Sequence, residues 1–329
     1  MKRIFIQGEA YYHCYSMTVH ERLLLDAEAR SVLVKILHKV AGFCGVTVVT
    51  YSVMGNGFHL LLRVPAAAAR EGLGDAELLR RFRLLYGDGR TRFMPIAAEG
   101  LERVLAAGGE DAVAWRRVLK ARMHDLPMLM KLLKQRFSKW YNASREVKGT
   151  LWADRYGSTL IDPAPGVLAQ VACCIDLQAL QAGVVEHPED YPWCGFAAAR
   201  MGDPAQAGAL AQVMAREGKV PRRALERYEA LLYQCAGMQP KRTRRDAMAE
   251  LLLGGLGPTG DPVMDHFIPY SVDRLAELCG AIVFGGYVFV EAQAQWVAKW
   301  LGRKKPGSCY QLGEGEWTLN RRLRGKSII

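Results

Sequence analysis

Two apolar runs joined by a glycine–asparagine–glycine sequence restrict the folds open to this chain more than any other feature. Residues 46–54, VTVVTYSVM, are rich in β-branched and aromatic side chains, and residues 59–64, HLLLRV, continue the apolar pattern. Such runs around a short glycine-containing connection predict an antiparallel β-hairpin. We expect the glycines to supply backbone conformations with positive φ. The hairpin also places a single imidazole, His59, beside three leucines.

The patterns around this hairpin predict an α+β fold. A loosely alternating strand is expected at 10–19 and an amphipathic helix at 21–43. A further strand is expected at 149–161, and further helices at 76–87, 114–120, 126–145, 165–180, 222–236, 271–281 and 290–302, the last two around a glycine-containing connector. The order of these elements predicts an antiparallel sheet backed by helices.

The length of 329 residues exceeds that of one typical domain. An alanine-rich stretch at 201–220 precedes Pro221 and predicts a linker. We therefore expect one domain over 1–200 and a smaller, basic and mainly helical domain over 221–329.

The net charge of +11 predicts a positively charged surface, for which nucleic acid is the usual partner. No apolar run reaches the ~18 residues that cross a bilayer, and the first residues lack the pattern of a signal peptide. The eight cysteines form no CxxC pair, which favours a reduced compartment. We expect a cytoplasmic, nucleoid-associated protein with no membrane partner.

Four stretches carry a resemblance to a known family, and they occur in the family's order. They are YYHCYSMTV, TYSVMGNGFHLLLRVP, LKQRFSKWYNASREVKGTLWADRYGSTLI and VACCIDLQALQAGVVEHPEDYPWCGF. Together the first 200 residues resemble the single-tyrosine HUH transposases, in the branch of the REP-associated tyrosine transposases.

The resemblance implies a ferredoxin-like fold and a defined chemistry. In this family a His-x-His pair on a central strand binds a divalent metal, and a tyrosine on a neighbouring helix attacks a phosphodiester of single-stranded DNA. A phenol with a pKa near 10 is a weak nucleophile, so the metal must neutralise charge at the phosphate. Two imidazoles at i and i+2 suit that metal because they share one face of a strand.

This chain departs from the pattern at both parts of the catalytic site. Gly57-Phe58-His59 stands where the family has His-x-His, so only the second histidine remains. Cys174 occupies the position matched to the tyrosine. The resemblance therefore implies no catalytic residues, with Gly57, His59 and Cys174 as vestigial positions and His59 as a residual metal ligand.

Replacement groups are present for each missing part. Asn56, Glu9 or His13 could join His59, but one histidine with oxygen donors would hold a metal weakly. We expect no cofactor, or weak Mg²⁺ or Mn²⁺ at most. Cys174 and Tyr141 are the alternative nucleophiles, and Tyr141 is more typical of an aromatic that packs or stacks on a base.

The remaining features favour DNA binding. Basic side chains interleaved with aromatic ones suit a surface that follows a nucleic-acid backbone and stacks its bases. The candidate DNA-binding residues are Lys134, Arg136, Lys139, Tyr141, Arg145, Lys148, Trp152, Arg155, Lys241, Arg242, Arg244, Arg245, Arg321, Arg322 and Arg324.

The function predicted from the sequence is that of a catalytically inactive, transposase-like protein, a monomer or homodimer, that binds single-stranded or hairpin DNA. Two alternatives stay open. One is an active metal-dependent transposase or endonuclease with a rebuilt site. The other is an RNA- or protein-binding adaptor on the same fold.

Overall fold

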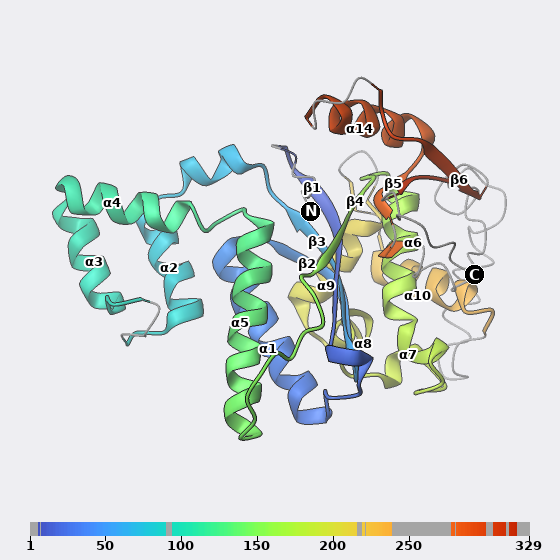
Figure 1. Cartoon of the computed structure of the whole chain (residues 1–329), viewed down its shortest axis with the longest axis horizontal. Helices are drawn as coiled ribbons and strands as arrows, with labels where there is room; N and C mark the ends of the chain where they lie inside the picture. The colour runs from blue at the N-terminus through green and yellow to red at the C-terminus, as the bar shows by residue number, and fades with distance from the viewer. Residues whose placement is uncertain are drawn as a thin grey trace.

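The computed structural model describes residues 6, 8–89, 94–215, 219–220, 222–238, 278–279, 281–300, 305–313 and 316–320. In this part of the chain seven strands form one sheet in the order β2-β3-β1-β4-β5-β7-β6 (Figure 1). The strands are β1 Ala10–Met17, β2 Thr47–Met54, β3 Gly57–Val64, β4 Gly157–Ile161, β5 Ala281–Gly285, β6 Cys309–Gly313 and β7 Glu316–Asn320. The α+β class predicted from the sequence is confirmed.

The predicted hairpin is present as β2 and β3, which pair antiparallel with Ser52 opposite His59. The expected reason for its glycines is wrong, because neither Gly55 nor Gly57 has positive φ. Both glycines instead allow close approach of other segments. A Cβ added to Gly55 would lie 3.0 Å from Cδ2 of Leu23, and one added to Gly57 would lie 2.6 Å from the carbonyl oxygen of Ser16.

Strand β1 lies between β3 and β4 and is antiparallel to both. His13 is opposite Leu61 on β3, and Tyr15 is opposite His59. Because directly opposed residues point to the same face of a sheet, His13, Tyr15 and His59 share one face.

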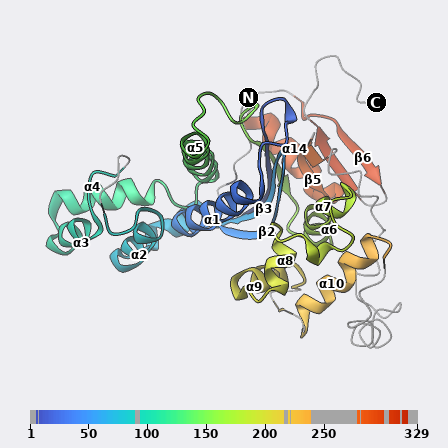
Figure 2. The same ribbon diagram turned by 90° about the horizontal axis from the view of Figure 1, so that it is seen from below.

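Helices cover both faces of the sheet (Figure 2). On one face α1 (Ala27–Cys44) packs against α5 (Leu126–Ser144), and the core there includes Phe58, Leu60 and Phe137. The other face carries the histidines and is covered by four helices: α6 Pro165–Asp176, α8 Gly195–Arg200, α9 Pro204–Val213 and α10 Ala224–Cys235. The short helix α7 (Gln178–Gln181) continues from the end of α6.

Helices α2 (Asp75–Tyr86), α3 (Ala98–Ala107) and α4 (Gly109–Lys120) pack on one another and project away from the sheet (Figure 1). Only α2 and the second half of α4 were expected from the sequence. Among the helices that the structure describes, none combines the length and the apolar character needed to span a bilayer.

Only residues 157–161 of the strand expected at 149–161 form a strand, β4. Three further differences concern the sheet, the expected linker and the C-terminal helices. The sheet is mixed rather than antiparallel throughout, because β5 runs parallel to β4. Segment 201–220, expected to be a linker, contains α9, which packs on β2. Of the two C-terminal helices expected, the one at 271–281 lies largely outside the described residues, and the one at 290–302 corresponds to α14 (Tyr287–Trp300). The connector expected between them contains β5. The domain boundaries themselves stay a prediction.

Candidate nucleic-acid interface

A groove of about 310 Å³ opens at the end of the sheet where β2 turns into β3. One wall comes from β1 and the hairpin, and the other comes from α7 and the residue after it. The lining residues are Met17, Met54, Asn56, Gly57, His59, Gln178, Gln181 and Ala182. Its polar groups are three amides and one imidazole. The buried Oε1 of Gln178 has no hydrogen-bond partner among the residues that the structure describes. The groove therefore offers neutral donors and acceptors rather than charge.

His59 is held at the groove by a second imidazole. Nδ1 of His59 and Nε2 of His13 are 3.0 Å apart, so one ring donates a hydrogen bond to the other. The two rings lie end to end in nearly one plane, with their centres 5.2 Å apart and their planes 13° apart, and the centre of the Tyr15 ring lies 5.7 Å from each of them. Burial lowers the pKa of His59 to about 3, and burial together with the neighbouring His59 lowers the pKa of His13 well below its usual value. Both rings are therefore neutral at physiological pH.

Gly57 occupies the position matched to the family's first histidine, and the space for that side chain is filled. A Cβ there would lie 2.6 Å from the carbonyl oxygen of Ser16 and 2.8 Å from Sδ of Met17. Since real Cβ atoms do not approach other atoms so closely, a histidine at 57 would require β1 to move. At this point β1 and β3 approach each other so closely that the structure has no room for a side chain at 57.

Cys174 lies on α6, on the same face of the sheet as His59, but it is 5 % exposed and belongs to the core under that helix. It does not line the groove. Its thiol is therefore packed away from any phosphate that the groove could admit.

Tyr141 lies on the opposite side of the sheet from His59. Its Oη donates to the carbonyl oxygen of Leu24 at 3.1 Å, and its ring packs beside Phe137 on α5. A phenol in this place cannot share a phosphate with His59, because the sheet lies between them.

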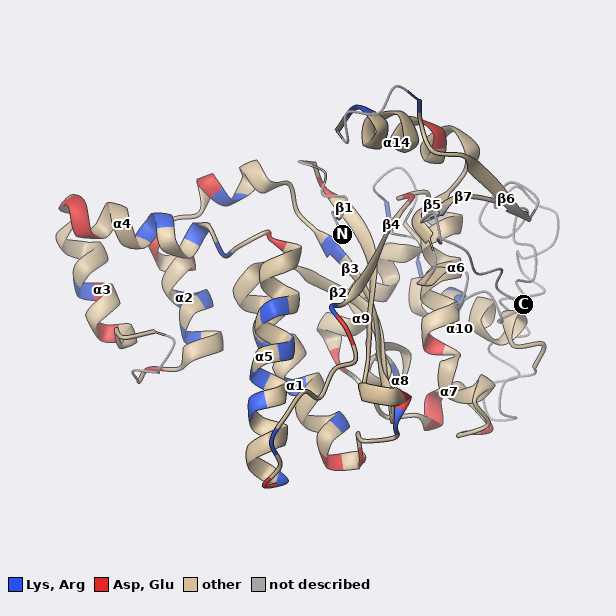
Figure 3. Ribbon diagram, in the orientation of Figure 1, with Lys and Arg blue, Asp and Glu red and all other residues tan. Residues whose placement is uncertain are grey.

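Several Lys and Arg residues lie along α5 (Figure 3), and the cations predicted there fall into two groups by their contacts. Arg136 lies over the ring of Tyr86, and Arg145 pairs with Asp26 and Glu28. These two guanidinium groups contact other helices of the protein. Lys139 is exposed on α5.

Lys134 and Trp152 contact each other, and Trp152 is withdrawn from solvent. Nζ of Lys134 donates to the carbonyl oxygen of Asp154 at 2.6 Å and lies 5.4 Å from the centre of the Trp152 ring. Trp152 itself is 6 % exposed and packs against Phe58 and Phe137. Because the indole is in the core, it leaves no ring face on which a base could stack.

Two exposed cations lie on the loop between α5 and β4, Lys148 and Arg155. This loop reaches the groove, because the N–H of Ala153 donates to the carbonyl oxygen of Met17 at 3.0 Å. The other predicted cations lie outside the described residues: Lys241, Arg242, Arg244, Arg245, Arg321, Arg322 and Arg324.

A buried carboxylate next to this site was missed in the sequence. Asp176, on α6, accepts hydrogen bonds from Oγ1 of Thr50 at 2.7 Å, from Oη of Tyr228 at 2.6 Å and from the N–H of Phe196 at 3.2 Å. Burial raises the pKa of Asp176 to about 6, against the opposite effect of these hydrogen bonds. Through these hydrogen bonds Asp176 links α6 to β2, α8 and α10. Helix α6 in turn leads into α7, which forms one wall of the groove. An acidic residue inside the otherwise apolar run VACCIDL was the available signal.

Comparison with known proteins finds similarity among solved structures, and that similarity is weak. No protein-family model and no curated protein matches the chain. Among solved structures, the chain is similar to one described as the REP-associated tyrosine transposase bound to a REP hairpin, at 13% sequence identity and a TM-score of 0.38. The match covers 67% of this chain and 92% of that one. This similarity is too low to assign the chain to a family.

Proposed function

We propose that this protein binds single-stranded or hairpin DNA without cleaving it. The observation that carries the proposal is the groove beside His59. Three amides, from Asn56, Gln178 and Gln181, surround the one imidazole that remains of the family's motif. The groove lies where the strand of that motif meets the end of the helix that carries the matched tyrosine position, Cys174.

The chemistry of the groove suits a nucleobase. Asn and Gln side chains each offer a donor and an acceptor, which match the edges of unpaired bases. Its volume of about 310 Å³ suits one small planar group rather than a duplex. The exposed Arg155 follows two residues after Ala153, which is hydrogen-bonded to the groove residue Met17. A phosphate beside a bound base would therefore meet a cation.

The positions of the possible nucleophiles support binding without cleavage. Tyr141 is on the far face of the sheet, and the thiol of Cys174 is buried under α6. The groove offers amide oxygens and one imidazole, which would hold Mg²⁺ or Mn²⁺ weakly. We expect no covalent adduct with DNA.

The connectivity supports a related fold. β1, α1, β2, β3, α5 and β4 follow one another with α2–α4 inserted before α5, and the four strands lie in the order β2-β3-β1-β4 with antiparallel pairing. We assign this part of the protein to a ferredoxin-like unit of the HUH type, extended by β5, β6 and β7.

The test is binding of a labelled DNA hairpin, measured by fluorescence anisotropy at several salt concentrations. Affinity should fall linearly with salt on a double-logarithmic scale, since phosphate contacts release counterions. Arg155→Glu should weaken binding at least about 10-fold, because it replaces an attraction by a repulsion beside the groove. Gln181→Glu should weaken it similarly, since it places a charge that repels phosphate in the groove wall.

Two control variants make the same changes elsewhere. Arg103→Glu changes an exposed arginine on α3, and Gln212→Glu changes an exposed glutamine on α9. Both should bind DNA like the unmodified protein. Equal losses in test and control variants would show binding by overall charge alone and would reject the groove. Tighter binding of an RNA hairpin would favour the adaptor alternative, and a gel-stable DNA adduct would favour the enzyme.

A further inference from the structure

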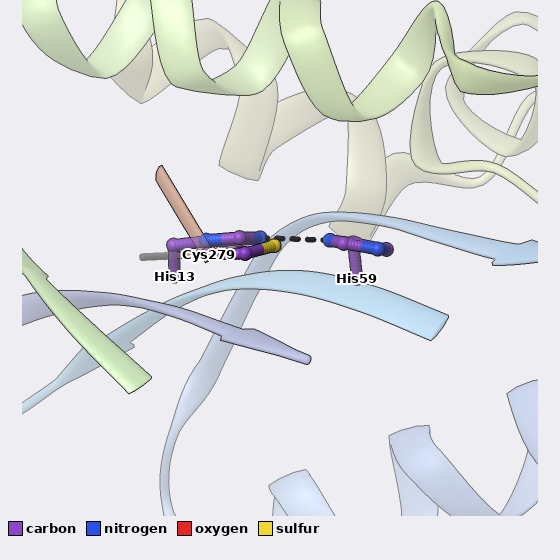
Figure 4. Close-up of side chains that lie close together, drawn as sticks. All are labelled: His13, His59 and Cys279. Atoms are coloured by element: carbon purple, nitrogen blue, oxygen red, sulfur yellow. Dashed lines mark hydrogen bonds between the residues drawn. The ribbon is translucent and has the colours of Figure 1, made fainter. Parts of the chain in front are cut away.

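Three side chains that can bind a metal converge on one point at the face of the sheet (Figure 4). His13 comes from β1, His59 from β3, and Cys279 from the segment that leads into β5. One possible ligand atom of each lies within 4.8 Å of the others. Figure 4 shows the imidazole nitrogen of His13 and the sulfur of Cys279 both directed toward His59.

We infer that His13, His59 and Cys279 form a binding site for a borderline-soft divalent metal ion, of which Zn²⁺ suits the donors best. Two imidazoles and a thiolate select zinc over Mg²⁺ or Mn²⁺, which prefer oxygen ligands. This inference does not depend on the proposed DNA binding.

The distances are close to those of a tetrahedral site. Zn–N bonds of about 2.05 Å place two ligand nitrogens about 3.3 Å apart, and the facing nitrogens of His13 and His59 are 3.0 Å apart. A Zn–S bond of about 2.3 Å requires the sulfur about 3.6 Å from each nitrogen. Closing the site therefore needs a shift of the half-buried Cys279 side chain and a rotation of the two imidazoles, whose facing nitrogens point at each other without metal.

The backbone around Cys279 is fixed to the sheet on both sides. Oη of Tyr15 donates to the carbonyl oxygen of Cys279 at 2.7 Å. Oγ1 of Thr159 donates to the carbonyl oxygens of Leu278 at 2.7 Å and Ala281 at 3.0 Å. Gly157 makes room for Tyr15, because a Cβ there would lie 2.2 Å from the phenol ring. These contacts place the thiol beside the histidines before any metal binds.

In the metal-bound state each imidazole would carry its one proton on the ring nitrogen that faces away from the other histidine. Without metal, one hydrogen lies between Nε2 of His13 and Nδ1 of His59. Metal binding takes the lone pairs of both atoms, so that hydrogen moves to the outer nitrogen of the same ring. Both rings are neutral at physiological pH, as ligands must be. The thiol of Cys279 releases its proton to solvent when it becomes a thiolate ligand.

Such a site would join three distant parts of the chain. The metal would bond β1 and β3 to the segment entering β5, and a water molecule would take the fourth position left by three protein ligands. Its main effect would be to stabilise the attachment of the C-terminal strands to the sheet.

The test uses the full chain, first stripped with a chelator and then titrated with Co²⁺ and Zn²⁺. Co²⁺ should bind at one ion per chain and give the absorption bands of a tetrahedral site together with a thiolate charge-transfer band. Cys279→Ser should abolish the charge-transfer band. It should weaken Zn²⁺ affinity by more than the roughly 10- to 100-fold that loss of an outer-shell partner costs. Tyr15→Phe removes the hydrogen bond to the backbone of Cys279 and should weaken Zn²⁺ affinity only by that roughly 10- to 100-fold.

The matched control is Cys309→Ser, which alters another partly buried cysteine on β6 and should leave the spectrum unchanged. Circular dichroism shows whether each variant is folded. Cys279→Ser is the deciding variant, because it changes a half-buried side chain by one atom and is therefore expected to leave the fold intact. Absence of the bands in the unmodified protein, or their persistence in Cys279→Ser, would reject the site.

Discussion

At the scale of single residues, the packing around Gly57 leaves no room for a side chain at this position. The carbonyl oxygen of Ser16 and the side chain of Met17 lie where a side chain at 57 would begin. Histidine therefore cannot be restored at this position without displacing β1. The sequence shows that position 57 has no imidazole. It could not predict that atoms of Ser16 and Met17 on β1 occupy the space beside this position.

Gly57→Ala should lower the free energy of unfolding by about 1–3 kcal/mol, as overpacking does in well-packed interiors. The added Cβ would stand 2.6 Å from the Ser16 oxygen. Urea denaturation followed by circular dichroism measures the change. The control is Gly208→Ala in α9, where a Cβ meets nothing within 4 Å and should stabilise the helix by about 0.5–1 kcal/mol. An unchanged free energy of unfolding in Gly57→Ala would mean that β1 moves to accommodate the added Cβ at little cost.

Asp176 and the two histidines should act in opposite directions on the pH dependence of stability. The native pKa of Asp176 is about 6, so between pH ~4 and 6 the native chain keeps a proton that the unfolded chain loses. Stability therefore falls as pH rises through this window, by up to about 3 kcal/mol. The lowered pKa values of His13 and His59 make the unfolded chain bind more protons below pH ~6.5, so their contribution to stability rises with pH.

Asp176→Asn removes the contribution of the Asp176 carboxyl, which decreases as pH rises. The increase in stability that the histidines produce from pH 4 to 6.5 should therefore become steeper. It should also cost about 1–3 kcal/mol, because the amide nitrogen cannot accept one of the buried hydrogen bonds. Urea denaturation at several pH values measures both effects. A variant with the same pH slope as the unmodified protein would show that the Asp176 carboxyl titrates normally.

At the scale of elements, segments with strong hydrophobic periodicity were predicted from the sequence. Segments whose faces differ little in polarity were not. The helix predicted at 126–145 and the strand predicted at 46–54 match α5 and β2 to within one residue at each end, whereas α1 begins six residues after the start predicted at 21. Helix α9 was taken for a linker, because PAQAGALAQV alternates small apolar residues with little difference between its faces. Strand β5 was missed because it is five residues long, ends in Gly285, and pairs with strands far away in the sequence.

The packing of α9 depends on an irregularity in β2. The register of β2 against β3 shifts between Val48 and Thr50, and the carbonyl oxygen of Val49 accepts from Nε2 of Gln206 at 2.6 Å. Because Gln206 is 2 % exposed, the helix supplies a hydrogen bond that this carbonyl group requires away from water.

Gln206→Leu should destabilise the protein by about 1–3 kcal/mol, since it leaves a buried carbonyl group without its donor. Gln212→Leu, on the exposed side of the same helix, should change stability by less than about 0.5 kcal/mol. Thermal and urea denaturation of the two variants provides the comparison. Equal effects would show that the hydrogen bond to Val49 contributes little.

At the scale of the whole molecule, the candidate metal site lay beyond sequence reasoning because it depends on long-range contacts. His13 was recognised as a possible partner of His59, but Cys279 was not. Its carbonyl oxygen contacts Tyr15, which is 264 residues away in the sequence. No local pattern indicates that β5 lies beside β4, and the two strands are paired at only Leu160–Val283 and Ile161–Phe284. Side-chain hydrogen bonds therefore carry a large part of this junction.

Thr159→Val should loosen the C-terminal strands while leaving the hairpin intact. The hydroxyl of Thr159 is buried and donates to the carbonyl oxygens of both Leu278 and Ala281. Valine keeps the branched shape but leaves those carbonyl groups with one donor fewer, at a cost of about 1–3 kcal/mol. Hydrogen exchange should therefore accelerate for the amides of β5 and β7 and stay unchanged in β2 and β3, since local opening requires only the contacts of the unit that opens. Thr47→Val makes the same substitution at an exposed position of β2 and should leave both regions unchanged. Faster exchange throughout the sheet in Thr159→Val would instead mean that β4 and β5 unfold only together with the hairpin, as one cooperative unit.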